Sequence, residues 1–424
     1  MQLMTMFLLM KRILNGMTIQ VILSRVILFN KFMNYLFPSE LLEKSIDERI
    51  AYFRNEVRIS HAKLTEALDE VIWAIKDGLP ESLIYLYGPT GVGKTTLLNI
   101  VHKKILEEYE SVIIDNPGIL PVVRILADSP HTGNFDWKSF FKELLEIMLE
   151  PLIDYKDDPY RWKVVKDEYD KLKAAAYRAT GGKYRTAFIN AVKYRETKIM
   201  LADDGQHFGV VTSGRKVFDQ TNTIKSVAEK TQLIIAMFGT YEMLPLRNLN
   251  GQTSRRSVDI HFQRYNAEYA DDIQGFKQAF GTLQRHLPLE EIPDCENEWD
   301  FFLERSLGCI GILKDWLTKA LAVSLRNNKK TISHAFLEKT SLSVHQCKKI
   351  LSEIVQGETD LIETAEERFL LRVSLSLENG KQSANGNQEN NNLKGKKKGN
   401  RKPGVQNPRR NRIGIENGRT NISK

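Results

Sequence analysis

Cysteine is scarce in this sequence. Only Cys295, Cys309 and Cys347 occur among its 424 residues. Three cysteines exclude a disulfide scaffold, and their spacing matches no metal-binding motif. We therefore expect a protein of a reducing compartment, the cytoplasm. The length and the 42% of hydrophobic residues are ample for a sizeable core and for two or three domains.

Long apolar runs are also scarce. The most apolar stretch, Ile19–Phe29 within the Met-rich residues 1–36, is interrupted by polar residues and falls far short of the ~20 residues that a membrane span needs. We therefore expect no membrane association. Three interpretations of residues 1–36 remain: a start codon placed too early, with Met17 or Met33 as the initiator, a small added helix for protein contact, or a membrane anchor. The sequence favours the first.

Acidic residues are nearly absent from the end of the chain. Asn379–Lys424 contains twelve Lys or Arg and two Glu, a net charge of +10, so the other 378 residues carry about −2 of the total of +8. This tail has too few apolar residues to offset its ordering entropy, and we expect it to be disordered. Its charge favours polyanions or the acidic face of a partner.

Short apolar segments alternate with helical patterns in the first two thirds of the chain. Strands are expected at Ser82–Tyr87, Leu120–Ala127, Lys198–Ala202 and Gln232–Phe238. Helices are expected at Asp47–Ile75, Lys94–Tyr109, Asp136–Leu149, Tyr160–Ala175 and Val217–Glu229. This alternation predicts an α/β domain with a mostly parallel sheet. Beyond about Asn266 only helical patterns occur, notably Gly311–Leu325 and Thr340–Val355, which indicates an all-α subdomain.

A phosphate-binding loop lies between the first expected strand and the helix after it. Its sequence fits the pattern G-x-x-x-x-G-K-[ST] in full: Gly88, Pro89, Thr90, Gly91, Val92, Gly93, Lys94, Thr95, followed by Thr96. Glycines let the backbone N–H groups turn toward phosphates, and the helix directs its positive dipole end at the same anion. We expect Lys94 to reach the β- and γ-phosphates of ATP and the Thr95 hydroxyl to bind Mg²⁺. The strand–loop–helix context favours this reading over a glycine-rich turn of no function.

Two acidic residues follow the third apolar strand. Asp203 and Asp204 come directly after Ile199–Ala202. In ATPases with such a loop, acidic residues at this position are expected to bind Mg²⁺ and to orient the attacking water. Asp203 would hold Mg²⁺ through water, and Asp204 would polarise the attacking water; the alternative is an ordinary turn or helix cap. The usual second acid is Glu, and Asp is one methylene shorter. The shorter side chain therefore leaves two alternatives to ordinary turnover, which are slow hydrolysis and ATP binding with little turnover.

Polar and basic residues follow the fourth strand. Thr240, at the tip of that strand, is a candidate to sense the γ-phosphate or the lytic water, with a helix cap as the alternative. Arg256, and after it Arg255, are candidates for an arginine that a neighbouring subunit inserts into the site to neutralise transition-state charge. A solvated or nucleic-acid-facing basic cluster is the competing interpretation of these arginines.

These motifs together resemble the TniB/TnsC family of transposition ATPases, which are AAA+ proteins. The similar segments span roughly residues 47–375: Tyr52 to His61, Leu68 to Ile72, the phosphate loop, Asp128 to Trp137, Asp203 to His207, Phe238 to Thr240, Gln252 to Arg256, and Gly308 to Gly311 heading an Ala- and Leu-rich helix. The resemblance implies a P-loop NTPase (AAA+) core with a parallel sheet, an all-α lid subdomain and the disordered basic tail. We accordingly expect an N-terminal extension (1–46), an AAA+ α/β domain (47–265), an α-helical lid (266–378) and the tail (379–424).

The same resemblance implies a function. It predicts an ATP- and Mg²⁺-dependent ATPase that self-associates into a ring or helical filament on double-stranded DNA. The assembly would couple a TniQ-like target-selection protein to a DDE transposase of the TnsB/TniA type, with the tail docking onto the transposase. Lys138, Lys183 and Arg185 are candidates for DNA contacts. No secure arginine of the lid is visible, and Lys314 or Arg326 would have to serve.

Two other functions remain open. The first is a replication-initiator or helicase-loader-like AAA+ ATPase that binds DNA. That class commonly reads bases with a helix-turn-helix module, and Thr331–Gly357 lacks a recognition helix rich in Arg, Asn and Gln. The second is a nucleotide switch without turnover that acts as a scaffold, which Asp204 makes credible.

Overall fold

The computed structural model describes residues 35–78, 80, 82–130, 134–151, 153, 180–209, 214–247, 255–293, 295 and 298–377. The chain divides into two units, Met1–Ile362 and Glu363–Lys424. The expected helix Tyr160–Ala175 and the basic tail lie outside the described residues. No helix among the described residues is long and apolar enough to cross a membrane.

A five-stranded sheet forms the centre of the first unit. Its strands are β1 (Leu83–Tyr87), β2 (Val122–Leu126), β3 (Ile199–Asp203), β4 (Ile234–Gly239) and β5 (Ser257–His261), in the order β2-β3-β4-β1-β5. All neighbouring strands are parallel, which confirms the predicted parallel sheet. Tyr87 pairs with Gly239 and Ala202 pairs with Met237. The carboxyl ends of β1, β3 and β4 therefore meet at one edge of the sheet, where the motifs that follow these strands come together.

Strand β5 was not expected from the sequence. It is an edge strand, and only Ile260 of its five residues is fully buried. An edge strand needs apolar side chains on one face only, so its hydrophobic signal is weak.

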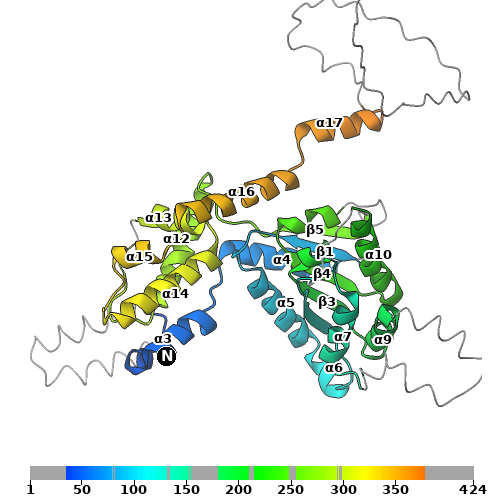
Figure 1. The fold of residues 1–424 in the computed structure, drawn as a ribbon, viewed down its shortest axis with the longest axis horizontal. Helices are drawn as coiled ribbons and strands as arrows, with labels where there is room; N and C mark the ends of the chain where they lie inside the picture. Colours follow the sequence, from blue (N-terminus) through cyan, green and yellow to red (C-terminus); the bar gives the residue numbers. More distant parts are fainter. Residues whose placement is uncertain are drawn as a thin grey trace, which may run out of the picture. The chain divides into compact units, whose positions relative to one another are not determined.

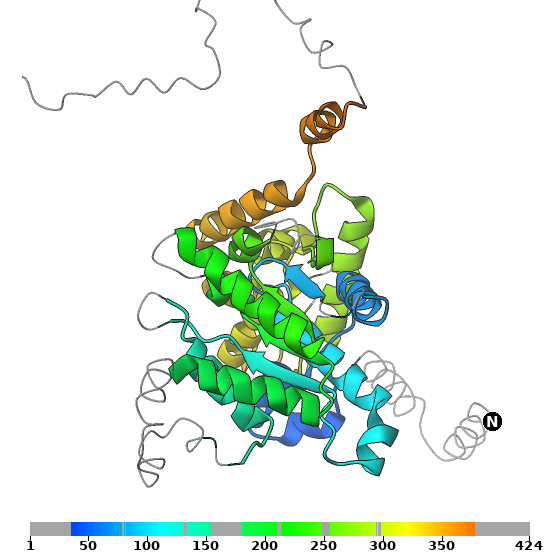
Figure 2. The same cartoon turned by 90° about the vertical axis from the view of Figure 1, so that its right-hand side faces the viewer.

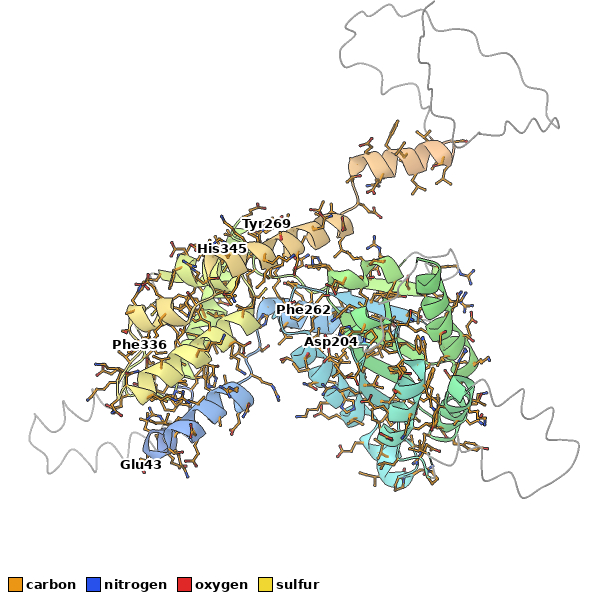
Figure 3. All side chains as sticks on the ribbon, viewed as in Figure 1. Glu43, Asp204, Phe262, Tyr269, Phe336 and His345 are labelled. Atoms are coloured by element: carbon orange, nitrogen blue, oxygen red, sulfur yellow. The ribbon has the colours of Figure 1, made fainter. Side chains whose placement is uncertain are left out.

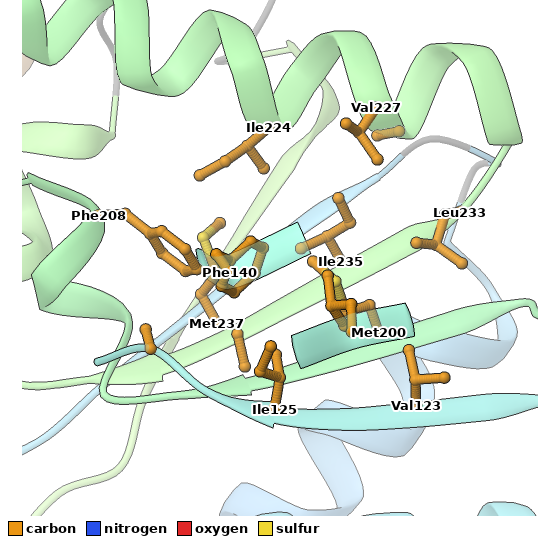
Figure 4. Close-up of a cluster of buried hydrophobic side chains, with 14 of the residues drawn as sticks. Val123, Ile125, Phe140, Met200, Phe208, Ile224, Val227, Leu233, Ile235 and Met237 are labelled. Carbon is orange, nitrogen blue, oxygen red and sulfur yellow. The ribbon is translucent and has the colours of Figure 1, made fainter. Parts of the chain in front are cut away.

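Within the described residues, one face of the sheet is covered by α7 (Trp137–Ile147), α9 (Thr180–Tyr194) and α10 (Gly214–Thr231). Alternate strand residues such as Val123, Ile125, Ile235 and Met237 point into this layer, where they meet Phe140 and others (Figure 4). In Figure 2 the green helices α9 and α10 lie across the sheet.

Helices α4 (Ala62–Lys76) and α5 (Lys94–Glu108) cover the other face, and α6 (Glu110–Asp115) follows α5 (Figure 1). The opposite set of strand residues, among them Leu86, Leu201 and Phe238, packs against this layer. Strands buried on both faces need nearly continuous apolar sequence, and this is why the sequence located β1 to β4 correctly.

A separate apolar core lies among the helices beyond Asn266, which the sequence predicts to be a lid and which keep that name here. Its helices are α12 (Ala270–Arg285), α13 (Trp299–Ser306), α14 (Ile310–Arg326) and α15 (His334–Thr340). The absence of strands beyond Asn266 is confirmed for the described residues. Ile50, Phe53 and Val57 also lie in this core, although they precede the sheet in the chain.

The expected continuous helix Asp47–Ile75 is therefore wrong. The segment forms α3 (Ile46–Ala51), a π-helical turn η2 (Tyr52–Glu56) and, after an extended connection, α4. Val57 has extended backbone angles, and His61 caps α4 by accepting a hydrogen bond from the N–H of Leu64. The break lets one half of the segment pack in the lid and the other half pack on the sheet.

The expected helix Thr340–Val355 also has different bounds. Helix α15 ends at Thr340, and α16 runs from Val344 to Leu361. Ser343 and Gln346 form a capping box that starts α16, which separates the two helices. In the second unit, α17 (Ala365–Ser374) begins with another capping box, formed by Thr364 and Glu367.

Candidate functional site

The phosphate loop connects the carboxyl end of β1 to the first turn of α5. Gly91 and Gly93 have φ angles of 75° and 117°, a left-handed backbone that side chains other than Gly rarely adopt. No side chain caps the first turn of α5, so its backbone N–H groups are available for an anion.

Lys94 closes this loop on itself. Its ammonium donates hydrogen bonds to the carbonyl oxygens of Gly88 (3.0 Å) and Pro89 (2.9 Å), and the residue is 9% exposed. Burial lowers the pKa of Lys94 to about 8, against the opposing effects of Cys309, Asp204 and Asp203. The ammonium is thus held within the loop, where the charges of Asp203 and Asp204 act on it, as the sequence predicted.

Asp203 and Thr95 meet at the carboxyl end of β3. Burial raises the pKa of Asp203, a hydrogen bond from Thr95 lowers it, and the charge of Asp204 raises it again. The Arg124 guanidinium lies 3.9 Å from the Asp203 carboxylate. A hydroxyl beside a buried carboxylate is the hard oxygen donor set that Mg²⁺ prefers, so these residues fit the expected ion.

Asp204 has a left-handed backbone with a φ of 52°, uncommon for a residue other than Gly. The Asp204 N–H donates a hydrogen bond to the Asp203 carboxylate at 3.1 Å. The side-chain amide of Gln206 donates another to the Asp204 carboxylate, also at 3.1 Å. The turn η4 (Gly205–Gly209) follows directly. Asp204, labelled in Figure 3, therefore has a fixed carboxylate rather than a freely rotating one.

Thr240 follows β4 and precedes the turn η5 (Tyr241–Leu246). Its N–H donates to the Gln206 side-chain oxygen at 3.2 Å. Its hydroxyl is buried and has no hydrogen-bond partner among the described residues. A buried hydroxyl without a partner is costly, and here it lies where a phosphate oxygen or a water molecule could satisfy it.

A cavity of about 610 Å³ adjoins these residues. The phosphate loop contributes Pro89 and Thr90, and Gln206 and Thr240 lie in its wall. The rest of the lining comes from η5 and from one side of α16. The site thus has open volume on the side of Gln206 and Thr240.

A smaller cavity of about 60 Å³ lies on the other side of the loop, between Gly93, Thr96 and the lid residue Lys314. His61 lines it as well, and burial lowers the pKa of His61 to about 4. The Nδ1 of His61 also lies 3.1 Å from the hydroxyl of Tyr265. In the sequence His61 stands only within a motif, and nothing there places it beside the loop.

The two candidate lid cations lie at different places on α14. Lys314 stands in the second turn and donates a 2.8 Å hydrogen bond to the carbonyl oxygen of Arg54. Arg326 is the last residue of the same helix, about 18 Å further along at 1.5 Å per residue. Only Lys314 is among the residues lining the small cavity.

The structure does not bring Arg255 and Arg256 to the phosphate loop of their own chain. They precede Ser257, which pairs with Leu83 at the start of β1, whereas the loop follows the end of β1. Arg256 lies 3.7 Å from Glu229 of α10. The arginines therefore lie toward the opposite edge of the sheet.

One ion pair near the site has no signal in the sequence. Arg264, just after β5, donates from Nε and Nη2 to the two carboxylate oxygens of Glu358 on α16, at 3.0 and 3.2 Å. Burial raises the pKa of Cys309 to about 12, and the charges of Arg264 and Lys94 oppose this rise. No sequence pattern links residues that are 94 positions apart.

The three candidate DNA-contacting residues lie on neighbouring helices. Lys138 is on α7, Lys183 and Arg185 are on α9, and these two helices pack together. The Lys138 ammonium lies 5.8 Å from the centre of the Tyr184 ring, a cation–π distance.

Residues 79–246 match the family model described as an AAA domain, and no curated protein matches the chain. Among solved structures, the chain is similar to the ORC2 protein of Aeropyrum pernix in ADPNP–ADP complexes (11% identity, 69% of this chain and 72% of that chain, TM-score 0.47). It is also similar to the ORC1 protein of the same organism in complex with DNA (12% identity, 69% of this chain and 68% of that chain, TM-score 0.42). A third similar structure is domain III of the Thermotoga maritima replication initiation protein DnaA (15% identity, 72% of this chain and 97% of that chain, TM-score 0.35). The fold is a P-loop AAA+ fold.

Proposed function

We propose that this protein is an AAA+ ATPase that binds and hydrolyses ATP and self-associates on double-stranded DNA. One observation carries the proposal. Lys94, Asp203, Asp204 and Thr240 come from three different strand ends and converge on one phosphate loop. A phosphate loop alone would support nucleotide binding, whereas the fixed Asp204 beside the unpartnered Thr240 hydroxyl supports hydrolysis as well.

Each residue has a defined task in this proposal. Backbone N–H groups of the loop and the Lys94 ammonium bind the β- and γ-phosphates. Thr95 and Asp203 would hold Mg²⁺, which supplies charge neutralisation when bound. The Asp204 carboxylate orients and polarises the attacking water, and the Thr240 hydroxyl donates to the γ-phosphate or to this water. Because Asp is shorter than Glu, turnover is expected to be slow.

The position of the arginines supports self-association. Phosphoryl transfer by this class of enzyme commonly uses a cation that neutralises the transition state. Arg255 and Arg256 lie toward the edge of the sheet opposite to their own phosphate loop. In the proposed assembly, an arginine of one copy completes the site of the next.

Two specific biological roles are candidates. The names of the similar solved structures, the ORC2 and ORC1 proteins and the replication initiation protein DnaA, fit a replication-initiator or helicase-loader-like ATPase. The sequence motifs fit a transposition regulator that couples a TniQ-like target selector to a DDE transposase. Both roles share the DNA-bound, ATP-dependent assembly, so this assembly is the central part of the proposal.

The test is assembly of the purified full chain with ATP and duplex DNA, observed by mass photometry and negative-stain microscopy. ATP-dependent rings or filaments on duplexes of arbitrary sequence, together with stimulation of a DDE transposase, are expected for the transposition regulator. Strong preference for one duplex sequence would identify the initiator or loader instead. Lys94→Ala should abolish nucleotide binding and assembly together. A chain that stays monomeric with saturating ATP and duplex refutes the proposal.

A further inference from the structure

We propose that Gln206 is a positioning residue for hydrolysis, which ties the Asp204 carboxylate, just after β3, to the backbone of Thr240, just after β4. This inference rests on the proposed ATPase function and adds a residue to which no role was given above. Gln206 lies in η4, two residues beyond Asp204. It is the one described residue whose side chain is hydrogen-bonded both to Asp204 and to the backbone of Thr240.

The two hydrogen bonds use both ends of the Gln206 amide. The nitrogen Nε2 donates to Oδ1 of Asp204 at 3.1 Å, and the oxygen Oε1 accepts from the N–H of Thr240 at 3.2 Å. An ionised carboxylate can only accept and a backbone N–H can only donate, so the orientation of the amide is determined. Only a neutral side chain with one donor and one acceptor at this spacing can make both bonds.

The surrounding backbone is shaped to bring this amide close. A Cβ added to Gly239, the last residue of β4, would lie 2.7 Å from the Gln206 Oε1 and 3.1 Å from its backbone nitrogen. A residue other than Gly at this position would push η4 away from the strand. The left-handed backbone of Asp204, held by a hydrogen bond from the His207 N–H to its carbonyl oxygen at 3.1 Å, directs the chain into the same turn.

The chemical consequence concerns the attacking water. In hydrolysis the water oxygen forms a bond to the γ-phosphorus, the bond to the bridging oxygen breaks, and its electron pair leaves with ADP. One water proton passes through Asp204 to solvent and the other stays on the released phosphate. A carboxylate bound on one oxygen by Gln206 keeps its other oxygen for the water, and the same amide fixes the backbone of Thr240. Positioning of this kind acts on kcat rather than on ATP affinity.

Two variants separate positioning from a merely structural role. Gln206→Ala removes both hydrogen bonds, and kcat should fall by about ten- to hundredfold, the range for a hydrogen bond to a charged group, while KM and the melting temperature stay close to wild type. Gln206→Glu keeps the acceptor but loses the donor when it is ionised. Its pKa should be raised by the adjacent Asp204, so it regains the donor as the pH falls.

The experiment is steady-state ATP hydrolysis with Mg²⁺ from pH 5.5 to 8.5, with the exposed Gln274→Ala of α12 as the control. The ratio of kcat for Gln206→Glu to that of wild type should rise as the pH falls, whereas the ratio for Gln206→Ala should stay flat. The double variant Asp204→Asn/Gln206→Ala should be no slower than Asp204→Asn alone, because Gln206 acts through Asp204. A Gln206→Ala variant with wild-type kcat, or a pH-independent ratio for Gln206→Glu, overturns this inference alone. Absence of Lys94-dependent turnover in the wild type overturns the proposed function instead.

Discussion

The backbone N–H of Gly311, in the first turn of lid helix α14, donates a 2.8 Å hydrogen bond to the carbonyl oxygen of Gly91 in the phosphate loop. The lid therefore touches the nucleotide-binding loop through backbone atoms. A Cβ at position 311 would lie 2.4 Å from that carbonyl oxygen, closer than any real contact. Movement of the lid and the conformation of the loop are thus directly linked.

The first prediction follows from this contact. Gly311→Ala forces the lid away from the loop, so it should weaken ATP binding and lower the free energy of unfolding by about 1–3 kcal/mol, as overpacking does. Gly281→Ala in α12 is the matched control, since an added Cβ there meets no atom within 4 Å. In that helix the change should stabilise the protein by about 0.5–1 kcal/mol. Urea unfolding and titration with a fluorescent ATP analogue measure both effects; equal behaviour of the two variants contradicts the prediction.

The second prediction concerns pH. The pKa of Lys94 is lowered to about 8, mainly by burial, so in the nucleotide-free protein the ammonium loses its proton above pH 8 rather than near 10.5. Binding of ATP needs the charged form and must then take up a proton. ATP affinity should therefore fall above pH 8 by up to tenfold per pH unit.

The matched variant is Lys94→Met, which lacks the titrating ammonium and, like Lys94→Ala, should not bind ATP. In the nucleotide-free protein, folding stability has the opposite pH dependence to ATP affinity. Between pH 8 and 10.5 the unfolded chain binds the extra proton, so the wild type should gain stability relative to Lys94→Met as the pH rises through this window. Thermal melts at fixed ionic strength measure this difference in stability. If the stabilities of the two proteins change with pH in the same way, the pKa of Lys94 is not lowered.

The third prediction concerns Asp204. Asp204→Asn keeps the shape of the side chain and tolerates the left-handed backbone, but it removes the charge that polarises water. Turnover should fall by about a hundredfold or more, with ATP binding retained. Asp69→Asn, on the exposed side of α4, should leave both unchanged. Single-turnover hydrolysis and equilibrium binding are the measurements, and unchanged turnover in Asp204→Asn would show that another group activates the water.

The fourth prediction tests whether the site is shared between copies. Arg256→Ala should bind ATP normally but hydrolyse it slowly, because the arginine serves the adjacent copy. Asp204→Asn has the complementary defect, a dead site with an intact arginine. A mixture of the two variants should recover turnover beyond the sum of the separate activities. Arg255→Ala distinguishes the two arginines, and a mixture without recovery argues for action within one chain or for none.

The fifth prediction compares two ion pairs that involve residues of α16. Arg264 and Glu358 are mostly buried and bonded through two oxygens, so Arg264→Ala leaves a buried carboxylate without its partner and should cost about 3 kcal/mol. Lys349 and Glu353 lie 3.1 Å apart but are largely exposed, so Lys349→Ala should cost about 0.5 kcal/mol or less. Urea unfolding gives both values, and equal losses would mean that the Arg264 pair is effectively solvated.

Much of the site is local in the chain, and the sequence alone determined that part. The phosphate loop, the acidic pair after β3 and Thr240 after β4 each belong to a strand end. In a parallel sheet those ends meet at one edge, so the strand pattern was enough to bring Lys94, Asp203 and Asp204 together. The buried strands β1 to β4 were found because burial on both faces requires continuous apolar sequence.

The tertiary structure alone decided the contacts between distant segments. Gln206 with Thr240, Gly311 with Gly91, and Arg264 with Glu358 join residues that no periodicity or motif relates. The division of residues 46–76 between two cores also has no local signal, because the helical period is the same on either side of the break. Such contacts depend on how whole helices pack, and packing is a property of the assembled chain rather than of any one segment.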